Sequence, residues 1–483
     1  MLKVTRREVL RLGTVMAGGV LAGCAPKIVE VTREVEKVVE KEKVVKETVV
    51  VTEEKVVEKE KVVKETVVVD SAAQKQADMK GKIIWDTFRT PGTGWNEERV
   101  ASFMANFPNA EVEFRPLVAS GQQDNYGKMY AMYAAGDLGD VCAFDPSHFH
   151  FWRAIDKEII IPIDDLIDAE QLDLAQWFPQ FIEMQRYKGK IYGLPSWGWA
   201  GFDCMIINSL IWENAGETVP DPKAYDTSID QITEWALKFH KEGEQWGIGL
   251  GWGEANVVVM TRIFGGDLIN ADGTKCMLLE PGSVEAMKWA YKLAVEDKIV
   301  PVGQDLAPGG DPALAAGKLV MYHGGSLNVL NAQKASTDPA IAKTSQILFP
   351  KRADGQIPSQ LRGGTWNICS QSKNVPVAWE FLKHITNTDG CVGFNLVSNN
   401  FGLVRPDLLP VLKAKNPIYD WFEANVMNGM NIAAPANSRG REYTDAIAQY
   451  GTKLMDKYNP MPFEQGLQEM HDAIQKVLDE EPA

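Results

Sequence analysis

The sequence is poor in histidine and cysteine and carries no excess of basic charge. Its 50 Lys and Arg stand against 65 Asp and Glu, which gives a formal net charge of −15 at pH 7. No strongly basic cluster follows the first eleven residues. Because a nucleic-acid groove needs basic side chains to neutralise phosphates, the composition argues against nucleic acid as a partner.

Several motifs that mark enzymes are also missing. There is no Walker A pattern, and Gly325-Ser326 is followed by Leu327, which breaks the nucleophile-elbow pattern GxSxG. The glycines of GIGLGWG, at 247–253, stand at every second position and lack the final gap of the dinucleotide-binding pattern. We therefore expect no nucleotide cofactor. Paired carboxylates for glycoside hydrolysis stay open, because such a pair is defined by a distance in space.

Cysteine and histidine give no sign of a metal centre, and no cofactor is expected. The five cysteines after Cys24 include no CxxC pair; they are Cys142, Cys204, Cys276, Cys369 and Cys391. One disulfide is compatible with this set, but single buried thiols are the favoured interpretation. Of the six histidines, only His148 and His150 are neighbours in sequence, so no metal-binding cluster is visible.

The N-terminus has the pattern of an export signal. Three arginines within the first eleven residues precede an apolar run at 12–21, and Leu21-Ala22-Gly23-Cys24 resembles a bacterial lipobox. This resemblance implies cleavage before Cys24 and lipid attachment to it, at the outer face of the cytoplasmic membrane. TRREVLR, at 5–11, also resembles a twin-arginine export signal. The alternative is an uncleaved anchor helix, although the run is shorter than the roughly 20 residues that span a bilayer.

Residues 25–79 form a repetitive charged and valine-rich segment, here called the stalk. The sequence EKVVEKEKVVKETVVV occurs at 36–51 and again, unchanged, at 54–69. The 18-residue period corresponds to about five helical turns, but the valines scatter around the helical wheel and valine is a mediocre helix former. We expect a loosely ordered stalk or a helix stabilised by a partner. A coiled-coil oligomerisation stalk is the alternative.

The folded body begins near Lys80 with alternating strands and helices. Apolar runs predict strands at 82–88, 110–117 and 141–144, separated by helices at 96–107 and 123–135. This order is typical of a parallel sheet, in which ligands bind beyond the carboxyl ends of the strands. Asp145 and Ser147 follow the third strand and are candidate binding residues.

The rest of the body is expected to be helix-rich in its middle and to return to sheet later. Residues 209–345 contain mainly helical patterns, with strands at 248–252 and 319–323. Strands at 345–349 and 365–370 follow. An amphipathic helix at 375–386 and two helices within 443–478 complete the chain.

The stretch at 187–216 stands out because two strands flank a loop. The first strand, 191–195, is expected to end at Pro195, since proline supplies no ladder hydrogen bond. A second, buried strand is expected at 204–208. Ser209 is expected to cap the following helix, which ends at Gly216.

The loop between these strands is rich in aromatic residues, as is the chain as a whole. It holds Trp197, Trp199 and Phe202. The chain has 14 tryptophans, of which six lie beside glycine or in loops after strands: Trp85, Trp95, Trp197, Trp199, Trp252 and Trp366. Aromatic faces pack against the C–H faces of sugars, whereas carboxylates, arginine and asparagine bind hydroxyls. The set favours a carbohydrate cleft, and ordinary packing is the alternative for any single tryptophan.

Four segments of the body carry a family resemblance. They are AAGDLGDVCAFD (134–145), YKGKIYGLPSWGWAGFDCMIIN with ENAG (187–216), LAAGKLVMYHGG (314–325) and GGTWNICSQSKNVPVAWEFLKHI (363–385). They resemble the extracellular solute-binding proteins of ABC importers, the carbohydrate-binding type related to maltose-binding protein. This resemblance implies an α/β, two-lobed periplasmic-binding-protein-like fold (type II) with an interlobe hinge.

The resemblance also implies the division of the body and the mode of action. The first lobe would comprise 80–199 with about 346–400, and the second, helix-rich lobe 200–345 with about 401–483. The lobes would close about the hinge around a sugar or oligosaccharide, without catalysing a reaction. The partners implied are the solute, the permease subunits of an ABC transporter, and the membrane through the lipid anchor.

The residues expected in the cleft come from the resemblance and from the aromatic and charged side chains near it. They are Phe88, Arg89, Asp145, Ser147, Trp197, Trp199, Phe202, Trp252, Glu254, His323, Ser326, Arg362, Trp366 and Arg439. Arg89, Arg362 and Arg439 would suit a charged solute, so a binder of a glycerophosphodiester or polyamine is the first alternative. A surface-anchored enzyme that acts on polysaccharide and an adhesin displayed on the stalk are the others.

Overall fold

The computed structural model describes two separate compact units, one within Met1–Gln76 and one comprising Ala77–Ala483. The described residues are 37–47, 59–69, 71–88, 94–118, 122–147, 149–199, 204–221, 227–306, 310–324, 344–347, 352, 357–391, 404–414, 429–432 and 437–480. The predicted leader, with Cys24, lies outside them. None of the described helices is both long and apolar enough to cross a bilayer.

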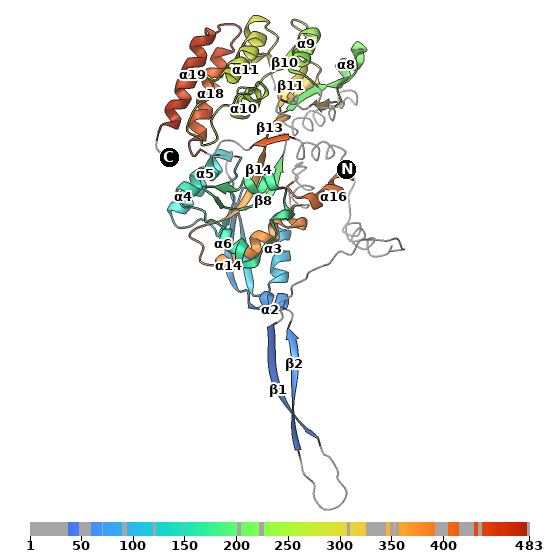
Figure 1. Cartoon of the computed structure of the whole chain (residues 1–483), viewed down its shortest axis with the longest axis vertical. Coiled ribbons are helices and arrows are strands. Elements are labelled where there is room, and N and C mark those ends of the chain that lie inside the picture. Colours follow the sequence, from blue (N-terminus) through green and yellow to red (C-terminus); the bar gives the residue numbers. More distant parts are fainter. Residues whose placement is uncertain are drawn as a thin grey trace, which may run out of the picture. The chain divides into compact units, whose positions relative to one another are not determined.

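The stalk is an antiparallel ribbon of two strands, β1 (Lys37–Glu47) and β2 (Lys59–Val69) (Figure 1). The expected loose or helical stalk is therefore wrong for these residues. Valine is β-branched, which disfavours helix and suits the pleated surface of a strand. The register also sets lysine opposite glutamate at four positions, an arrangement that stabilises paired strands.

The first sheet of the body has five strands in the order β4-β3-β5-β14-β8. Its strands are β3 (Gly81–Thr87), β4 (Ala110–Pro116), β5 (Val141–Cys142), β8 (Leu194–Trp199) and β14 (Arg362–Ile368). β3 runs parallel to β4 and β5, which confirms the predicted βαβ order, whereas β14 is antiparallel to β5 and β8. The helices of this lobe are α3 (Trp95–Asn106), α4 (Gln122–Ala134), α5 (His150–Asp156), α6 (Asp164–Glu170), α7 (Pro179–Glu183) and α14 (Val375–Thr386).

The second sheet has four strands in the order β10-β11-β9-β12. They are β9 (Cys204–Asn208), β10 (Trp246–Gly249), β11 (Leu319–Gly324) and β12 (Thr344–Ile347). The helices of this lobe are α8 (Ser209–Ala215), α9 (Ile229–Phe239), α10 (Glu254–Ile263), α11 (Pro281–Tyr291), α12 (Gly310–Ala315), α18 (Gly440–Leu454) and α19 (Phe463–Leu478), several of which are labelled in Figure 1. The body is thus a two-lobed α/β protein in which each lobe has its own sheet.

Shorter elements complete the described chain. They are α2 (Ser71–Asp78), η2 (Leu174–Gln176), β6 (Arg186–Tyr187), β7 (Lys190–Ile191), η3 (Lys292–Glu296), η4 (Gly303–Leu306), β13 (Ile357–Gln360), η5 (Pro406–Leu408), α16 (Leu409–Lys413) and β15 (Gly429–Ile432). β13 and β15 form a separate parallel pair.

Two local predictions in the central stretch are wrong. Pro195 lies inside β8 rather than ending a strand, which is tolerated because β8 is the edge strand of its sheet and the register shifts opposite it, between Gly364 and Thr365. Asn208, not Ser209, caps α8, since its side chain accepts a hydrogen bond from the backbone N–H of Leu210.

The segment at 404–414 packs on the first lobe, although residues from 401 onward were assigned to the second. Val404, Leu408 and Leu412 are buried in the first lobe's hydrophobic core. The guanidinium of Arg405 donates a hydrogen bond to the carbonyl of Thr386, at the end of α14, at 3.3 Å. The chain therefore leaves the first lobe later than the sequence indicated.

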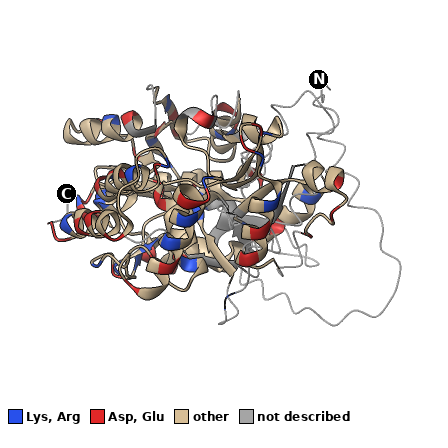
Figure 2. Ribbon diagram, turned by 90° about the horizontal axis from the view of Figure 1, so that it is seen from above, with Lys and Arg blue, Asp and Glu red and all other residues tan. Residues whose placement is uncertain are grey.

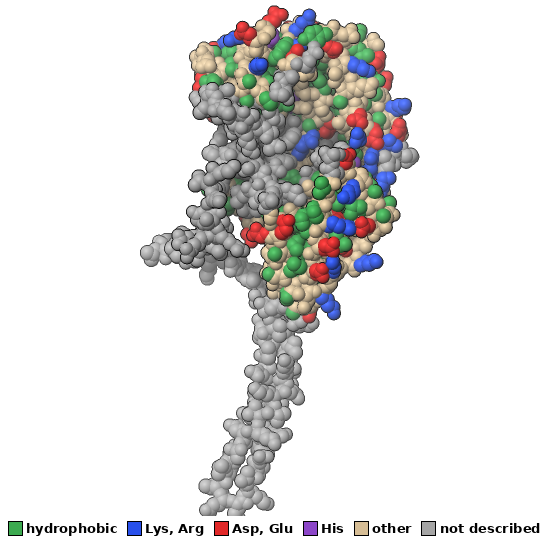
Figure 3. Space-filling model, turned by 180° about the vertical axis from the view of Figure 1, so that it is seen from behind, with side chains coloured by type: hydrophobic (Ala, Val, Ile, Leu, Met, Phe, Trp, Pro, Cys, Tyr) green, Lys and Arg blue, Asp and Glu red, His purple; other side chains and the backbone are tan. Residues whose placement is uncertain are grey.

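Acidic and basic residues are interspersed along the ribbon of the body (Figure 2). The described part of the face in Figure 3 likewise shows Lys and Arg next to Asp and Glu. Many of these side chains are paired, for example Lys82 with Glu111 and Glu113. The net negative charge is therefore distributed rather than gathered on one element.

Candidate functional site

A cavity of about 350 Å³ lies between elements of the two lobes. The first lobe supplies residues at and before α5, and the second supplies the starts of α10 and α18. The lining residues are Ser147, Phe149, Trp152, Gly253, Glu254, Ala255, Arg362, Gly440, Arg441, Tyr443, Thr444 and Asp445. The volume lies within the usual range for sites that hold a small molecule.

An ion pair between the lobes forms one wall of this cavity. The guanidinium of Arg362, on β14, lies 3.4 Å from the carboxylate of Glu254, in the first turn of α10. The side-chain amide of Gln360 donates to the same carboxylate at 3.4 Å, and Arg362 donates to Gln360 at 2.9 Å. Glu254 is 12% exposed, and burial raises the pKa of its carboxyl while Arg362 opposes the rise. The carboxylate, the guanidinium and the amide therefore form one hydrogen-bonded network that joins β13 and β14 to α10.

A second wall comes from α18. Burial and the nearby Glu254 carboxylate raise the pKa of Tyr443 well above its ordinary value, so its phenol stays protonated. Arg441 and Asp445, one turn apart on the same helix, form a second ion pair at 3.6 Å. This wall offers both donors and acceptors.

The aromatic part of the lining comes from Phe149 and Trp152, which belong to the first lobe. Both are largely buried, with 8% and 3% of their surface exposed. The cavity therefore combines an apolar side with two acid–base pairs.

The two lobes touch at the rim of the cavity. Arg153, on α5, donates hydrogen bonds to the carbonyl of Ser438 at 3.0 Å and to the carboxylate of Glu442, on α18, at 3.0 and 3.3 Å. Gly440 lies against Phe149, where a Cβ would approach the phenylalanine Cβ to 2.5 Å. Only glycine permits this approach without displacing one lobe from the other.

Three of the predicted residues meet at the cavity, and all carry polar groups. They are Ser147, Glu254 and Arg362. The Ser147 hydroxyl also exchanges 2.5 Å hydrogen bonds with the backbone of Gly363, which fixes the loop after β5 against β14. Asp145 is fully buried instead, and its carboxylate accepts hydrogen bonds from the Tyr126 hydroxyl and the Thr365 amide. These contacts hold Asp145 inside the first lobe.

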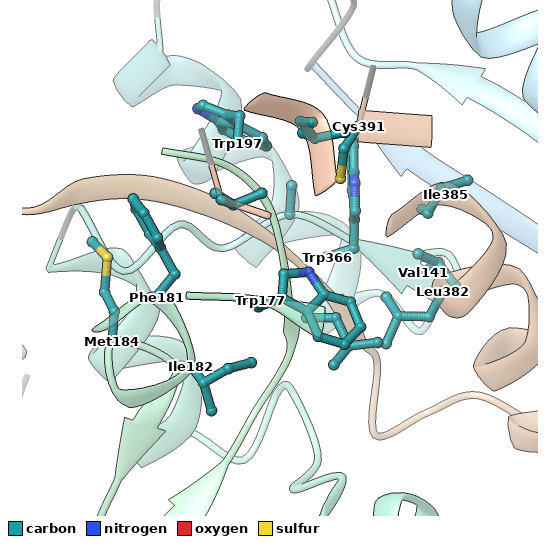
Figure 4. Packing of buried hydrophobic residues seen from close by; sticks show 14 of the residues in the cluster. Val141, Trp177, Phe181, Ile182, Met184, Trp197, Trp366, Leu382, Ile385 and Cys391 are labelled. Atoms are coloured by element: carbon teal, nitrogen blue, oxygen red, sulfur yellow. The ribbon is translucent and has the colours of Figure 1, made fainter. Parts of the chain in front are cut away.

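The two predicted tryptophans whose side chains are described near the hinge are packing residues. Trp197 is 2% exposed and Trp366 is fully buried, both in the core of the first lobe beside Trp177 and Phe181 (Figure 4). Their ring centroids are 6.2 Å apart in an edge-to-face arrangement. The expectation that Trp197 faces the cleft is therefore wrong. Trp199 is part of β8, but its side chain is not among the described ones.

Four other predicted residues do not line the cavity. Phe88 packs edge-on against Tyr126 with centroids 5.1 Å apart, and Trp252 packs against the second core beside Gly451. His323 is buried inside β11, and Arg439 forms an ion pair with Glu480 at 2.7 Å. The remaining predicted positions, Arg89, Phe202 and Ser326, lie outside the described residues.

The sequence did not point to the α18 wall or to the aromatic lining residues Phe149 and Trp152. Tyr443, Thr444 and Asp445 stand in an ordinary amphipathic helix, about 190 residues after Glu254 in the chain. The available signal was Gly440, a glycine in the first turn of a helix. Glycine is usually found at such a position because another group approaches the backbone closely. Among the described residues, no group of three His, Cys, Asp or Glu is arranged to hold a metal ion.

Two α/β lobes with a ligand-sized cavity between them define a two-lobed binding protein. The chain belongs to the family of bacterial extracellular solute-binding proteins, which matches residues 98–394. This confirms the predicted family. A comparison with curated proteins finds no match.

Solved structures with the same fold cover most of the chain. An ABC substrate-binding protein from Listeria monocytogenes, in complex with cycloalternan, is 17% identical with a TM-score of 0.68; the match covers 83% of this chain and 99% of that one. An ABC transporter solute-binding protein from Thermotoga lettingae, bound with α-D-tagatose, is 20% identical with a TM-score of 0.65; the match covers 83% of this chain and 100% of that one. UgpB from Mycobacterium tuberculosis, in complex with glycerophosphocholine, is 15% identical with a TM-score of 0.66; the match covers 83% of this chain and 99% of that one. These likenesses confirm the two-lobed fold.

Proposed function

We propose that this chain is the solute-capturing component of an ABC importer and binds a neutral sugar or oligosaccharide in the cavity between its lobes. The observation that carries the proposal is the composition of that cavity: two acid–base pairs beside aromatic residues. Sugar hydroxyls both donate and accept hydrogen bonds, so a carboxylate beside a guanidinium suits a pair of adjacent hydroxyls. The solved structures with cycloalternan and tagatose support this solute class.

The charge balance of the cavity favours a neutral solute over a charged one. Each arginine in the lining, Arg362 and Arg441, has a carboxylate within 4 Å, so the lining carries no net charge from these four groups. An anion would have to compete with Glu254 for Arg362, and a polyamine would have to compete with Arg362 for Glu254. The glycerophosphocholine complex of UgpB keeps a charged diester as the second candidate.

Capture would work by closure of the lobes, without a chemical reaction. The solute would touch residues of both lobes at once, for example Trp152 on α5 and Tyr443 on α18. Only the closed arrangement offers both sets of contacts, so the solute would stabilise that arrangement by the difference in affinity. The role requires no catalytic residue in the cavity.

Export and anchoring complete the proposal. The leader would direct the chain out of the cell, and Cys24 would carry the lipid that holds it at the outer face of the cytoplasmic membrane. The captured solute would then pass to the permease subunits of the transporter. Labelling with a radioactive fatty acid tests the anchor, since Cys24→Ala should abolish the label.

Isothermal titration of the body with a panel of mono- and oligosaccharides tests the solute class, with glycerophosphodiesters and polyamines as comparisons. A sugar should bind the native chain, and Glu254→Gln should weaken it by roughly 10- to 100-fold, because a hydrogen bond to a charged group contributes about 1.5–3 kcal/mol. Arg439→Ala is the matched control, since Arg439 pairs with Glu480 and not with the cavity. Binding of a glycerophosphodiester but no sugar would replace the sugar assignment with the second candidate.

A further inference from the structure

The register of the stalk ribbon is symmetric about one position of its repeat. Val44 of β1 is opposite Val62 of β2, and each is the ninth residue of the repeated sequence EKVVEKEKVVKETVVV. On either side of this pair, Lys41 is opposite Glu65 and Glu47 is opposite Lys59. The antiparallel pairing therefore aligns one copy of the repeat with the other copy in reversed order, centred on the ninth residue of each.

This self-matching register is favourable at most of its positions. Lysine is opposite glutamate in four of the pairs, and three pairs oppose two valines. None of the eleven pairs between β1 and β2 opposes two charges of the same sign. Cross-strand pairs of opposite charge and of β-branched residues both stabilise antiparallel strands, whereas like charges destabilise them.

The ribbon has little else to hold it together. In the described residues each of its strands has one neighbour, so β1 and β2 each leave an edge of backbone N–H and C=O groups without a strand beside it. Successive residues of a strand belong to opposite faces, and the sequences of β1 and β2 hold both valines and charged residues at odd and at even positions, so neither set of alternate positions is apolar. An isolated two-stranded hairpin is marginally stable in water, and added strands are its usual source of stability.

We propose that a second copy of this chain supplies those strands, by pairing its ribbon edge to edge with this one. The two repeats are identical and 18 residues apart, so Glu47 occupies the place in its repeat that Glu65 occupies in the other. When β1 pairs antiparallel with β1 of the second copy about a two-fold axis at Val44, Lys41 lies opposite Glu47 and Glu42 lies opposite Lys46. The contact between copies then repeats the pairs found within the ribbon.

This symmetry is what distinguishes a second copy from another partner. A two-fold contact requires a surface that is complementary to itself, and the register supplies one. Pairing of the two ribbons gives a four-stranded sheet with four lysine–glutamate pairs at the new junction. The contact involves the stalk only and does not depend on which solute the body binds.

A variant with exchanged charges tests the pairing while keeping the ribbon of each copy intact. Its eight substitutions are Lys41→Glu, Glu42→Lys, Lys46→Glu, Glu47→Lys, Lys59→Glu, Glu60→Lys, Lys64→Glu and Glu65→Lys. Every pair within the exchanged ribbon still joins opposite charges, and so does every pair between two exchanged copies. A native copy facing an exchanged copy instead meets four like-charge pairs.

The full chain in non-ionic detergent, prepared with two different affinity tags, gives the measurement. Native copies should capture native copies and exchanged copies should capture exchanged copies, with dimers in sedimentation velocity. The association constant between a native and an exchanged copy should be lower by about tenfold or more, since each of the four reversed pairs changes it by roughly twofold. Thermal unfolding of the body, unchanged between the variants, serves as the folding control.

Two results would overturn the proposal. One is a chain that stays monomeric at all concentrations tested, in which case the ribbon stands alone or pairs with a different partner. The other is equal capture of native and exchanged copies by each other, which would show association through another surface. Failure of sugar binding has no bearing on either result, because the tags and sedimentation report the stalk contact directly.

Discussion

Replacing Glu442 with glutamine removes the carboxylate that joins α18 of the second lobe to α5 of the first. The Arg153 guanidinium contacts that carboxylate at 3.0 and 3.3 Å and keeps a separate hydrogen bond to the carbonyl of Ser438. In the proposed closure, opening of the lobes would separate α5 from α18, so the ion pair would stabilise the closed arrangement and not the open one. The substitution should therefore shift the balance toward the open form and weaken solute affinity.

The size of this effect follows from the exposure of the pair. The Arg153 side chain is 17% exposed and that of Glu442 is 37% exposed, so solvent screens the attraction in part. We expect a loss of about 1 kcal/mol, which corresponds to roughly a fivefold weaker affinity. Added salt should narrow the difference between native chain and variant, because the lost attraction is electrostatic.

The assay combines calorimetric titration with small-angle scattering of the solute-free chain. Glu442→Gln should give a larger radius of gyration without solute and the same radius at saturation. Glu280→Gln is the matched control, because Glu280 pairs with Lys275 inside the second lobe at 2.9 Å. A double-mutant cycle with Arg153→Met isolates the pair. If the coupling in that cycle is close to zero, or if the control weakens binding as much, the ion pair does not set the closed arrangement.

Three further predictions follow from buried residues. Gly440→Ala should weaken solute binding without unfolding the lobes, because the added Cβ would approach that of Phe149 to 2.5 Å; calorimetry and urea unfolding measure the two effects separately. Gly364→Ala should lower the free energy of unfolding by about 1–3 kcal/mol or more, because its Cβ would overlap the Trp197 indole. Gly303→Ala is the control in the same urea titration and should change the stability little, because the space around Gly303 is open. Burial lowers the pKa of His323 to about 3, below its ordinary value near 6.5, so the neutral form is favoured in the folded state and stability is lost as the pH falls from about 6.5 toward 3. Between pH 6.5 and 5 this residue should account for roughly 2 kcal/mol of stability. His323→Asn should therefore flatten the curve of unfolding free energy against pH in that interval, and an unchanged slope would contradict the prediction.

The order of the secondary structure could be derived from the sequence because it depends on local patterns. The helix predicted at 375–386 is α14 (Val375–Thr386), where apolar residues recur at helical spacing after Asn374. Gly216 ends α8 in the left-handed conformation that the glycine predicted. The parallel pairing of β3 with β4 and β5 likewise follows from the alternation of strands and helices.

The stalk and the aromatic residues were less accessible to sequence patterns. The repeat fits a helical period, but β-branching and cross-strand charge pairs favour strands, and only the register shows which charges oppose each other. For Trp197 and Trp366, composition gives the same signal whether an indole faces a sugar or a core. The close approach of β8 and β14 across Gly364, which leaves room for the Trp197 ring, decides for the core.

By itself the sequence determined the family, the βαβ order of the first lobe, the repetitive stalk and the polar candidates Ser147, Glu254 and Arg362. These follow from residue types and spacings along the chain. Only the tertiary structure decided that Glu254 faces Arg362, that α18 completes the cavity, and that Arg153 reaches Glu442. Such contacts join residues that are about 100 to 290 positions apart, and they depend on how two lobes pack, which no local pattern encodes.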